Sequence, residues 1–284
     1  MKEGVYYLGE LGNPPILSGY LIVNEKGDSA IVESGPTSTA DEYLKRASEY
    51  VPLDTLKYVF ISHVHLDHSG GFWKISRELP QVKAVVFEKG ARHLIDPRKL
   101  VEASRMALGR IYDFWGDPEP VQEDKIVSVA DGYLNEEFGV RIIYTPGHAS
   151  HSTALYHEKT QTLFPGDSAG MLIIGEGGVL WPAAPPPFYM DMFVESLKKL
   201  QQLKLKRICY PHYGCSGRPY AVLEEALSTY TFLDGFLREG CRRSSGADLF
   251  DEIMGMQRFR GLPRSEYFDE FYRLNLRGFA GSCV

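Results

Sequence analysis

The chain has 284 residues, of which 44% are hydrophobic and 24% charged, so it can bury a core of ordinary size. Its formal net charge of -6 disfavours a protein whose main role is to hold nucleic-acid phosphates. No stretch approaches the roughly 18 apolar residues of a membrane span, and the amino terminus lacks the basic and apolar segments of a secretion signal. We therefore expect a cytoplasmic protein, with neither a membrane nor a nucleic acid as partner.

Strand and helix patterns alternate through the first two thirds of the chain. Short apolar runs predict strands at residues 20–23, 29–32, 58–61, 82–87, 125–129, 140–144, 153–157, 162–164 and 207–210. Helical patterns occupy residues 40–50 and the amphipathic stretch around 193–203. A Gly- and Pro-rich loop should follow Asp167 and end in the apolar stretch 180–190.

Two segments depart from this alternation. A long helical pattern at about residues 91–116, interrupted at Asp96-Pro97, predicts an inserted helical hairpin or lid. After Gly217 only helical patterns remain, at residues 219–238, 247–256 and 265–273. We therefore expect a catalytic domain at 1–217 and a helical extension at 218–284, which leaves open whether the extension forms a homodimer.

The four cysteines are too few and too widely spaced to indicate a zinc ribbon or a disulfide framework. We expect reduced thiols at Cys209, Cys215, Cys241 and Cys283.

The strongest functional signal is His-Val-His-Leu-Asp-His at residues 63–68, directly after a predicted strand and before Ser69-Gly70-Gly71. Neutral imidazoles and carboxylates suit zinc or another divalent metal, and a catalytic site keeps one position for water. These four donors, His63, His65, Asp67 and His68, could by themselves build one metal site.

A second site needs donors from elsewhere, and three candidates stand just beyond predicted strands. They are His148 in Thr-Pro-Gly-His, Asp167 in Phe-Pro-Gly-Asp and His212 in Tyr-Pro-His. Taken singly, each has an alternative interpretation as a loop residue satisfied by the backbone. The other histidines, His93, His151 and His157, are expected to be structural, with His151 the nearest to an exception.

Taken together, the order and context of these residues resemble the metallo-β-lactamase superfamily over about residues 5–214. That family has H-x-H-x-D-H, then a His after a Pro-Gly turn, an Asp after a Gly and a His after a Pro. The resemblance implies a four-layer αββα sandwich of the α/β class, here with a C-terminal helical extension. It also implies that His63, His65 and His148 bind one metal, that Asp67, His68 and His212 bind a second, and that Asp167 bridges the two.

One position departs from the family pattern. The family often has an Asp, followed by Ser or Thr and Gly, after its second strand, whereas this chain has Glu33-Ser34-Gly35. Glu33 is expected to support the metal ligands from outside, on a slightly different backbone.

The resulting hypothesis is a dinuclear hydrolase with two divalent metal ions, zinc first, with iron or manganese as alternatives. A metal-bridging hydroxide would attack a small-molecule ester, thioester or lactone, because coordination lowers the pKa of water to about 7. Asp67 could also orient the nucleophile, and Tyr213 could donate a hydrogen bond to the intermediate or simply pack. The helical extension suggests, by analogy only, a layout of the glyoxalase II type.

Three rival functions remain open. A nuclease or phosphodiesterase of the same family would need a basic track that the acidic balance does not indicate. An iron-dependent oxidoreductase on the same fold is disfavoured, because diiron relatives have Glu where this chain has His65. A scaffold protein without activity would be expected to have lost ligands, and none is lost here.

Overall fold

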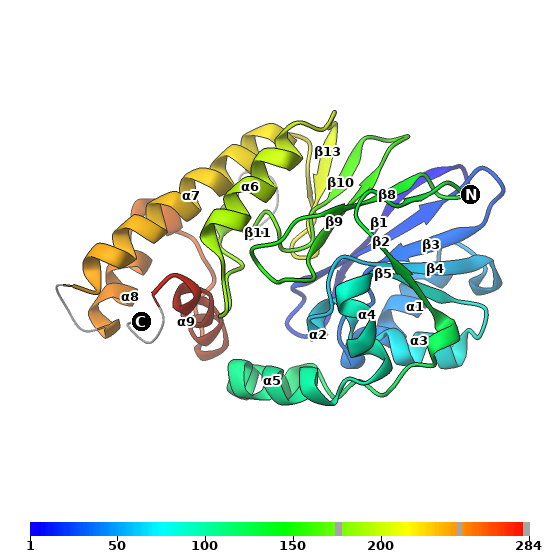
Figure 1. Ribbon diagram of the computed structural model, residues 1–284, viewed down its shortest axis with the longest axis horizontal. Coiled ribbons are helices and arrows are strands. Elements are labelled where there is room, and N and C mark those ends of the chain that lie inside the picture. The colour runs from blue at the N-terminus through cyan, green and yellow to red at the C-terminus, as the bar shows by residue number, and fades with distance from the viewer. Residues whose placement is uncertain (174–177, 243–245, 281–284) are drawn as a thin grey trace.

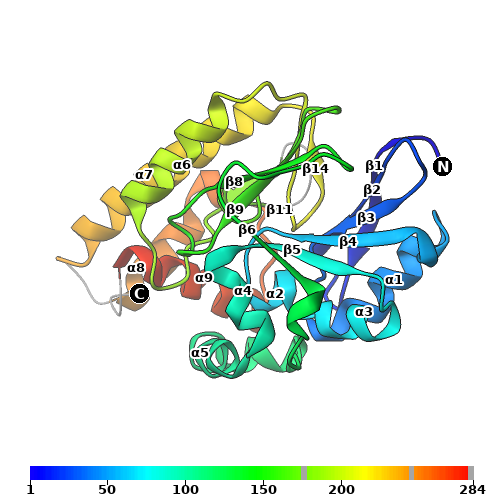
Figure 2. The ribbon, with the colours of Figure 1, turned by 45° about the vertical axis from the view of Figure 1, so that its right-hand side comes forward.

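Figure 1 shows a computed structural model of the protein, which describes residues 1–173, 178–242 and 246–280. Two six-stranded sheets pack face to face, and helices cover the outer face of each sheet (Figures 1 and 2). The expected four-layer αββα sandwich is therefore confirmed. Because both sheets are covered on both sides, the central strands at residues 17–23, 29–32 and 162–164 are buried at every position.

The first sheet runs in chain order. Its strands are β1 (Gly4–Leu11), β2 (Leu17–Val23), β3 (Ser29–Val32), β4 (Leu56–Ile61), β5 (Lys83–Phe87) and β6 (Ile126–Val129). β1, β2 and β3 pair antiparallel, whereas β3, β4, β5 and β6 pair in parallel. The sequence patterns missed β1, which forms the outer edge.

The second sheet has a mixed order. It consists of β14 (Cys215–Ser216), β13 (Arg207–Cys209), β10 (Thr162–Phe164), β9 (Thr153–His157), β8 (Val140–Tyr144) and β7 (Leu134–Asn135). Only β10 and β13 pair in parallel.

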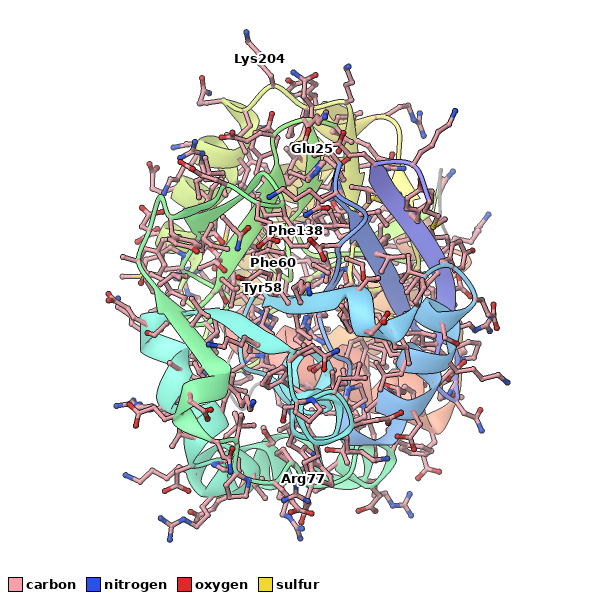
Figure 3. All side chains as sticks on the ribbon, turned by 90° about the vertical axis from the view of Figure 1, so that its right-hand side faces the viewer. Glu25, Tyr58, Phe60, Arg77, Phe138 and Lys204 are labelled. Atoms are coloured by element: carbon pink, nitrogen blue, oxygen red, sulfur yellow. A yellow bond between two sulfur atoms is a disulfide. The ribbon has the colours of Figure 1, made fainter. Side chains whose placement is uncertain are left out.

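Alternation along β2 explains how one strand serves two cores. Tyr20 and Ile22 join the core between the sheets, whereas Leu21 and Val23 join the core under the outer helices. Phe138 packs edge-on against Phe60 in the core between the sheets. Figure 3 shows these rings inside the sandwich, whereas Arg77 and Lys204 project outward.

The outer layers are helical. α1 (Ala40–Ser48), α3 (Phe72–Glu78) and α4 (Glu88–Ile95) cover the first sheet, and α6 (Met190–Gln201) and α7 (Pro219–Gly240) cover the second. α2 (Leu66–Ser69) is a single turn, and short 3₁₀ turns occupy Thr37–Thr39, Leu53–Thr55, Glu123–Lys125 and Gln257–Phe259. In the described part of the chain, no helix is both long and apolar enough to cross a bilayer.

A cap covers one end of the sandwich. It joins α5 (Arg98–Leu108) and the 3₁₀ turn η3 (Gly109–Phe114) to α9 (Glu266–Ala280), while α8 (Gly246–Gly255) lies beyond. Arg110 pairs with Glu266, and the ring of Phe114 meets Tyr267 edge-on at 5.3 Å between centroids. The insert and the C-terminal helices therefore contact each other. The division of the chain at residue 217 stays a prediction.

Two expectations need correction. The stretch after Asp167 was expected to be a loop, but it contains the paired strands β11 (Met171–Ile173) and β12 (Val179–Trp181). Cys209 and Cys215 were expected to be reduced, yet β13 and β14 pair them directly opposite, with Cα atoms 4.0 Å apart, and they form a disulfide. Cys241 is also disulfide-bonded, and Cys283 lies outside the described residues.

Candidate metal centre

Every predicted metal donor follows the end of a strand. His63, His65, Asp67 and His68 follow β4, with the last two on α2, while His148, Asp167 and His212 follow β8, β10 and β13. The donors from both sheets therefore lie together at one edge of the sandwich. The structure brings all seven together, and three overlapping groups of them lie close enough to hold a metal ion.

The first group is a triangle of imidazole nitrogens. Nε2 of His63 lies 3.1 Å from Nδ1 of His65, and Nε2 of His148 lies 3.1 Å and 2.9 Å from these two atoms. Three nitrogen ligands about 2.0–2.1 Å from a tetrahedral zinc ion would lie only slightly farther from one another than these nitrogen atoms do. The triangle therefore has the dimensions of one face of a metal site.

The protonation of these rings also suits a metal. Nδ1 of His148 donates a hydrogen bond of 2.8 Å to the Ala183 carbonyl, which can only accept, so in the neutral ring Nε2 keeps its lone pair. Burial, and then the neighbouring histidines, hold the pKa values of His63 and His65 well below the usual range. Burial likewise lowers the pKa of His148. Neutral imidazole is the form that binds metal.

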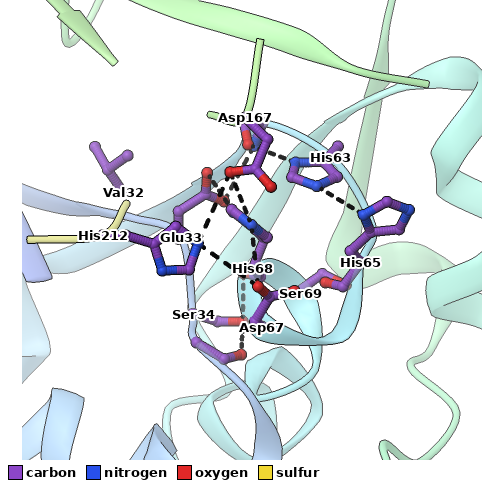
Figure 4. Close-up of polar contacts among 12 residues, drawn as sticks. Val32, Glu33, Ser34, His63, His65, Asp67, His68, Ser69, Asp167 and His212 are labelled. Carbon is purple, nitrogen blue, oxygen red and sulfur yellow. Dashed lines mark hydrogen bonds and ion pairs between the residues drawn. The ribbon is translucent and has the colours of Figure 1, made fainter. Parts of the chain in front are cut away.

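The second group, shown in Figure 4, contains Asp67, His68 and His212. Oδ2 of Asp67 lies 3.5 Å from Nε2 of His68 and 3.7 Å from Nε2 of His212. Nδ1 of His212 donates to the carbonyl of Ile16 at 3.3 Å, so in the neutral ring the lone pair of Nε2 faces the carboxylate.

Asp167 lies between the two groups. Its Oδ2 is 3.5 Å from Nε2 of His148 in the first group. Its Oδ1 is 3.5 Å from Nε2 of His68 and 3.8 Å from Nε2 of His212 in the second. One carboxylate thus presents one oxygen to each group. Figure 4 shows Asp167 beside His68 and His212.

The unmatched polar atoms test whether a cation fits. Nε2 of His68, Nε2 of His212 and Oδ1 of Asp167 are buried without a hydrogen-bond partner, which is costly unless another group satisfies them. Although burial opposes ionisation, the neighbouring His68 lowers the pKa values of Asp67 and Asp167 to about 2. A divalent cation would satisfy these atoms and balance two buried carboxylates.

Glu33 supports the centre from behind. Its Oε1 lies 3.3 Å from Nδ1 of His68, and its Oε2 accepts a 3.1 Å hydrogen bond from the backbone N–H of Ser62. Burial opposes a charge on His68, but the carboxylates of Asp67, Asp167 and Glu33 raise its pKa well above the usual value. Glu33 has a left-handed φ of 63°. Whether this backbone differs from that of the family's Asp stays a prediction.

Two glycines are required for the donors to approach. A Cβ on Gly147, whose φ is 133°, would lie 2.5 Å from the Cα of Phe193 at the start of α6. A Cβ on Gly166, whose φ is 53°, would lie 2.5 Å from Oγ of Ser62. The Pro-Gly turns before His148 and Asp167 therefore permit close packing as well as tight turning.

A cavity of about 330 Å³ opens over the centre. The donors His65, Asp67, His148, Asp167 and His212 line its floor. Its other walls come from α5, α9, Trp115 and the proline-rich loop before Tyr189, as the sequence suggested for the insert and that loop.

The remaining candidates differ in position. His151 lines the cavity, with its ring 5.6 Å from that of His65, and His93 lines it farther out. His157 lies in β9 and bonds to Thr160. Tyr213 is not among the residues that line the cavity, and its ring packs against two hydrophobic clusters. Its catalytic role stays a prediction.

Sequence reasoning missed the contribution of the C-terminal helices. Phe271, Leu274 and Asn275 of α9 line the cavity. The hydroxyl of Tyr230 on α7 accepts a 2.7 Å hydrogen bond from the Ala183 N–H, beside the carbonyl that holds His148. The i, i+3, i+4 spacing of the α9 residues indicated a shared face, but nothing indicated what the face would cover.

A family model described as the metallo-beta-lactamase superfamily matches residues 15–212, which include all seven donors and the strands that carry them. The chain belongs to the metallo-β-lactamase superfamily. The resemblance inferred from the donor pattern is confirmed.

Within the superfamily, the chain is 33% identical over 218 residues to the metallo-beta-lactamase fold-containing protein ST1585 of Sulfurisphaera tokodaii, covering 72% of this chain and 76% of that protein. A crystal structure of ST1585, described as from Sulfolobus tokodaii, superposes with a TM-score of 0.75 at 24% identity, covering 98% and 99% of the two chains. That likeness extends the shared fold to the C-terminal helices.

Two more distant relatives have named activities. The chain is 28% identical to a hydroxyacylglutathione hydrolase of Chelativorans, covering 66% of this chain and 58% of that protein. It is 23% identical to an atrochrysone carboxyl ACP thioesterase of Aspergillus fumigatus, covering 68% of this chain and 49% of that protein. The chain therefore matches only about half of the length of each of these two relatives.

Superfamily membership and the clustered His and Asp side chains together indicate a metal-dependent hydrolase with a divalent-metal site.

Proposed function

We propose that this protein is a dinuclear metal-dependent hydrolase that cleaves an ester, thioester or lactone of a small molecule. The observation that carries the proposal is the position of Asp167, whose two oxygens face two separate groups of donors. Zinc is the expected metal, because imidazole and carboxylate donors suit it, with iron and manganese as alternatives.

The first group would hold one ion through His63, His65 and His148, and the second would hold another through Asp67, His68 and His212. Bound there, the ions would polarise the substrate carbonyl and make water nucleophilic near neutral pH. Asp67 lines the cavity as a carboxylate, so it could accept a hydrogen bond from the attacking water and orient it. A role for Tyr213 as a hydrogen-bond donor would require it to reach a cavity that it does not line.

Two observations support an acyl substrate over a phosphodiester. One distant relative is named a thioesterase and another a hydrolase of an acylated glutathione. Of the described residues that line the cavity, Lys99 alone is a Lys or Arg, and a site built for a phosphate backbone would be expected to present several.

The proposal is tested by metal analysis together with a substrate panel. Protein purified without added metal is analysed by mass spectrometry, then assayed on thioesters, p-nitrophenyl esters, lactones and bis(p-nitrophenyl) phosphate. We expect close to two metal ions per chain and turnover on acyl substrates. Strong phosphodiester turnover with none on acyl substrates, or two irons with oxygen consumption, would overturn the proposal in favour of a rival.

Asp67→Asn tests the role of the carboxylate, and Asp41→Asn is its control because Asp41 pairs with Lys74 on the surface. We expect Asp67→Asn to lose second-site metal, turnover, or both, and Asp41→Asn to lose neither. Unchanged metal content and turnover in Asp67→Asn would refute the mechanism.

A further inference from the structure

One face of α5 lines the cavity along about two turns of the helix. The residues on this face are Leu100, Ala103, Ser104, Ala107 and Leu108. Their spacing of three and four places them on one side of the helix. From Leu100 to Leu108 this face spans about 12 Å at the rise of an α-helix. The cavity is therefore elongated along α5.

The opposite wall comes from α9, more than 150 residues later in the chain. Phe271 and Leu274 face the cavity there, and Trp115 contributes a third large apolar surface. Arg110–Glu266 and Phe114–Tyr267 join η3, which directly follows α5, to α9. The cavity therefore has α5 on one side and α9 on another.

Small residues leave this chamber open. Ala103 and Ala107 stand at adjacent turns of α5 with their side chains exposed, and larger side chains there would extend into the cavity. The same cavity includes His65, Asp67 and Asp167, so the apolar chamber is continuous with the metal centre. Apart from the donors, Lys99 is the one fully charged side chain among the described residues that line the cavity, and neighbouring Asp96 pairs with Arg98.

We propose that the chamber between α5 and α9 is an acyl-chain subsite that selects substrates with an extended, unbranched aliphatic acyl group. The proposal rests on the proposed acyl hydrolase and adds its substrate class. An elongated space of about 330 Å³, at the lower end of the range for small-molecule sites, suits a single chain better than a bulky polycyclic group. Ala103 and Ala107 set the length of chain that fits.

The direct test is a series of acyl thioesters or p-nitrophenyl esters from acetyl to decanoyl. With wild-type protein, kcat/KM should rise about fourfold for each added methylene until the chamber is full, because each methylene leaves water. The ratio of octanoyl to acetyl kcat/KM is the readout, since general damage to the enzyme changes both values together.

Ala107→Phe fills the chamber, and Met106→Phe is its matched control. Met106 is the preceding residue on α5, it does not line the cavity, and it is 83% exposed, so the same aromatic ring would lie in solvent away from the cavity. We expect the octanoyl-to-acetyl ratio to fall at least tenfold in Ala107→Phe and to stay within twofold of wild type in Met106→Phe. Equal ratios in all three proteins, or a wild type indifferent to chain length, would overturn the subsite.

A binding measurement separates the subsite from the proposed function. Calorimetric titration with n-octanol, which carries no carboxylate to bind a metal, should show binding to wild type and Met106→Phe but not to Ala107→Phe. If no acyl substrate is cleaved and this binding pattern holds, the proposed function fails while the apolar chamber stands. If short acyl substrates are cleaved but octanol does not bind, the subsite fails and the hydrolase stands.

Discussion

The carbonyl of Ala183 accepts a hydrogen bond from Nδ1 of His148, and this contact couples the candidate metal centre to the C-terminal helices. The hydroxyl of Tyr230 on α7 accepts a hydrogen bond from the N–H of Ala183. Oδ1 of Asn275 on α9 accepts a 2.7 Å hydrogen bond from the N–H of the next residue, Ala184. The loop that orients His148 is therefore held from two helices. The C-terminal helices position the metal centre as well as covering it.

Removing the Tyr230 hydroxyl should weaken both folding and metal binding. Tyr230→Phe leaves the buried N–H of Ala183 without an acceptor, which costs about 1–3 kcal/mol of unfolding free energy. We expect denaturant unfolding to show this loss and metal titration to show reduced affinity. Tyr220→Phe is the control, because Tyr220 on the same helix makes comparable backbone bonds at the surface, away from the centre. Equal metal affinity in the two variants would argue against positioning through Ala183.

A methyl group on Gly147 should displace His148. In Gly147→Ala the new Cβ would meet the backbone of Phe193, which cannot move without shifting α6. Gly139→Ala is the control: Gly139 also has positive φ, but a Cβ there meets nothing within 4 Å. Both variants lose about 1–2 kcal/mol to the left-handed backbone. Gly147→Ala should lose more stability, together with metal content, and equal losses in both would contradict the close approach.

If Asp167 is shared between the two groups, replacing it should change metal content differently from replacing His212. His212→Ala removes a donor from the second group only, so about one metal ion per chain should remain. Asp167→Ala removes an oxygen from each group, so the affinity at both positions should fall. Metal content after equilibration with a weak chelator measures the difference. If Asp167→Ala keeps one ion at wild-type affinity, the carboxylate is not shared.

His157, remote from the centre, should contribute to pH-dependent stability. Burial lowers its pKa to about 4, whereas an unfolded His titrates near 6.5. Nδ1 of His157 accepts a hydrogen bond from the backbone N–H of Thr160, so this nitrogen must carry no proton. The unfolded chain therefore binds more protons between pH 6.5 and 4, so the unfolding free energy falls as the pH decreases through this window.

His157→Gln isolates that contribution. From pH 7 to pH 4, wild type should lose on the order of 2 kcal/mol more stability than the variant. Denaturant unfolding at several pH values gives the comparison, in which the other histidines titrate in both proteins. Parallel stability curves would show that His157 is not the responsible group.

The sequence was sufficient to predict that the seven candidate donors lie together, because each comes shortly after the end of an apolar strand. The strands at residues 29–32, 140–144 and 162–164 were predicted with the bounds that the structure has. Once these strands form, short Pro-Gly turns leave His148 and Asp167 little freedom of position. The local sequence pattern of strand and turn therefore agrees with the position that the fold gives to these residues.

Features that depend on distant contacts were not predictable in this way. The disulfide between Cys209 and Cys215 depends on the pairing of β13 with β14, which no periodicity indicates. Tyr213 follows a donor directly, but its positive φ of 58° turns the chain and its ring packs into apolar clusters. The contact from Tyr230 to Ala183 joins a side chain to a backbone group, which leaves no residue pattern in the loop.

The central claim is that two ions lie on either side of the Asp167 carboxylate. Anomalous diffraction from crystals grown with zinc, with data at the zinc absorption edge, tests it most directly. We predict two peaks about 3.5–4 Å apart, one beside His63, His65 and His148 and the other beside Asp67, His68 and His212. No peak in either group, or a single peak with Asp167 turned away from it, would contradict the account.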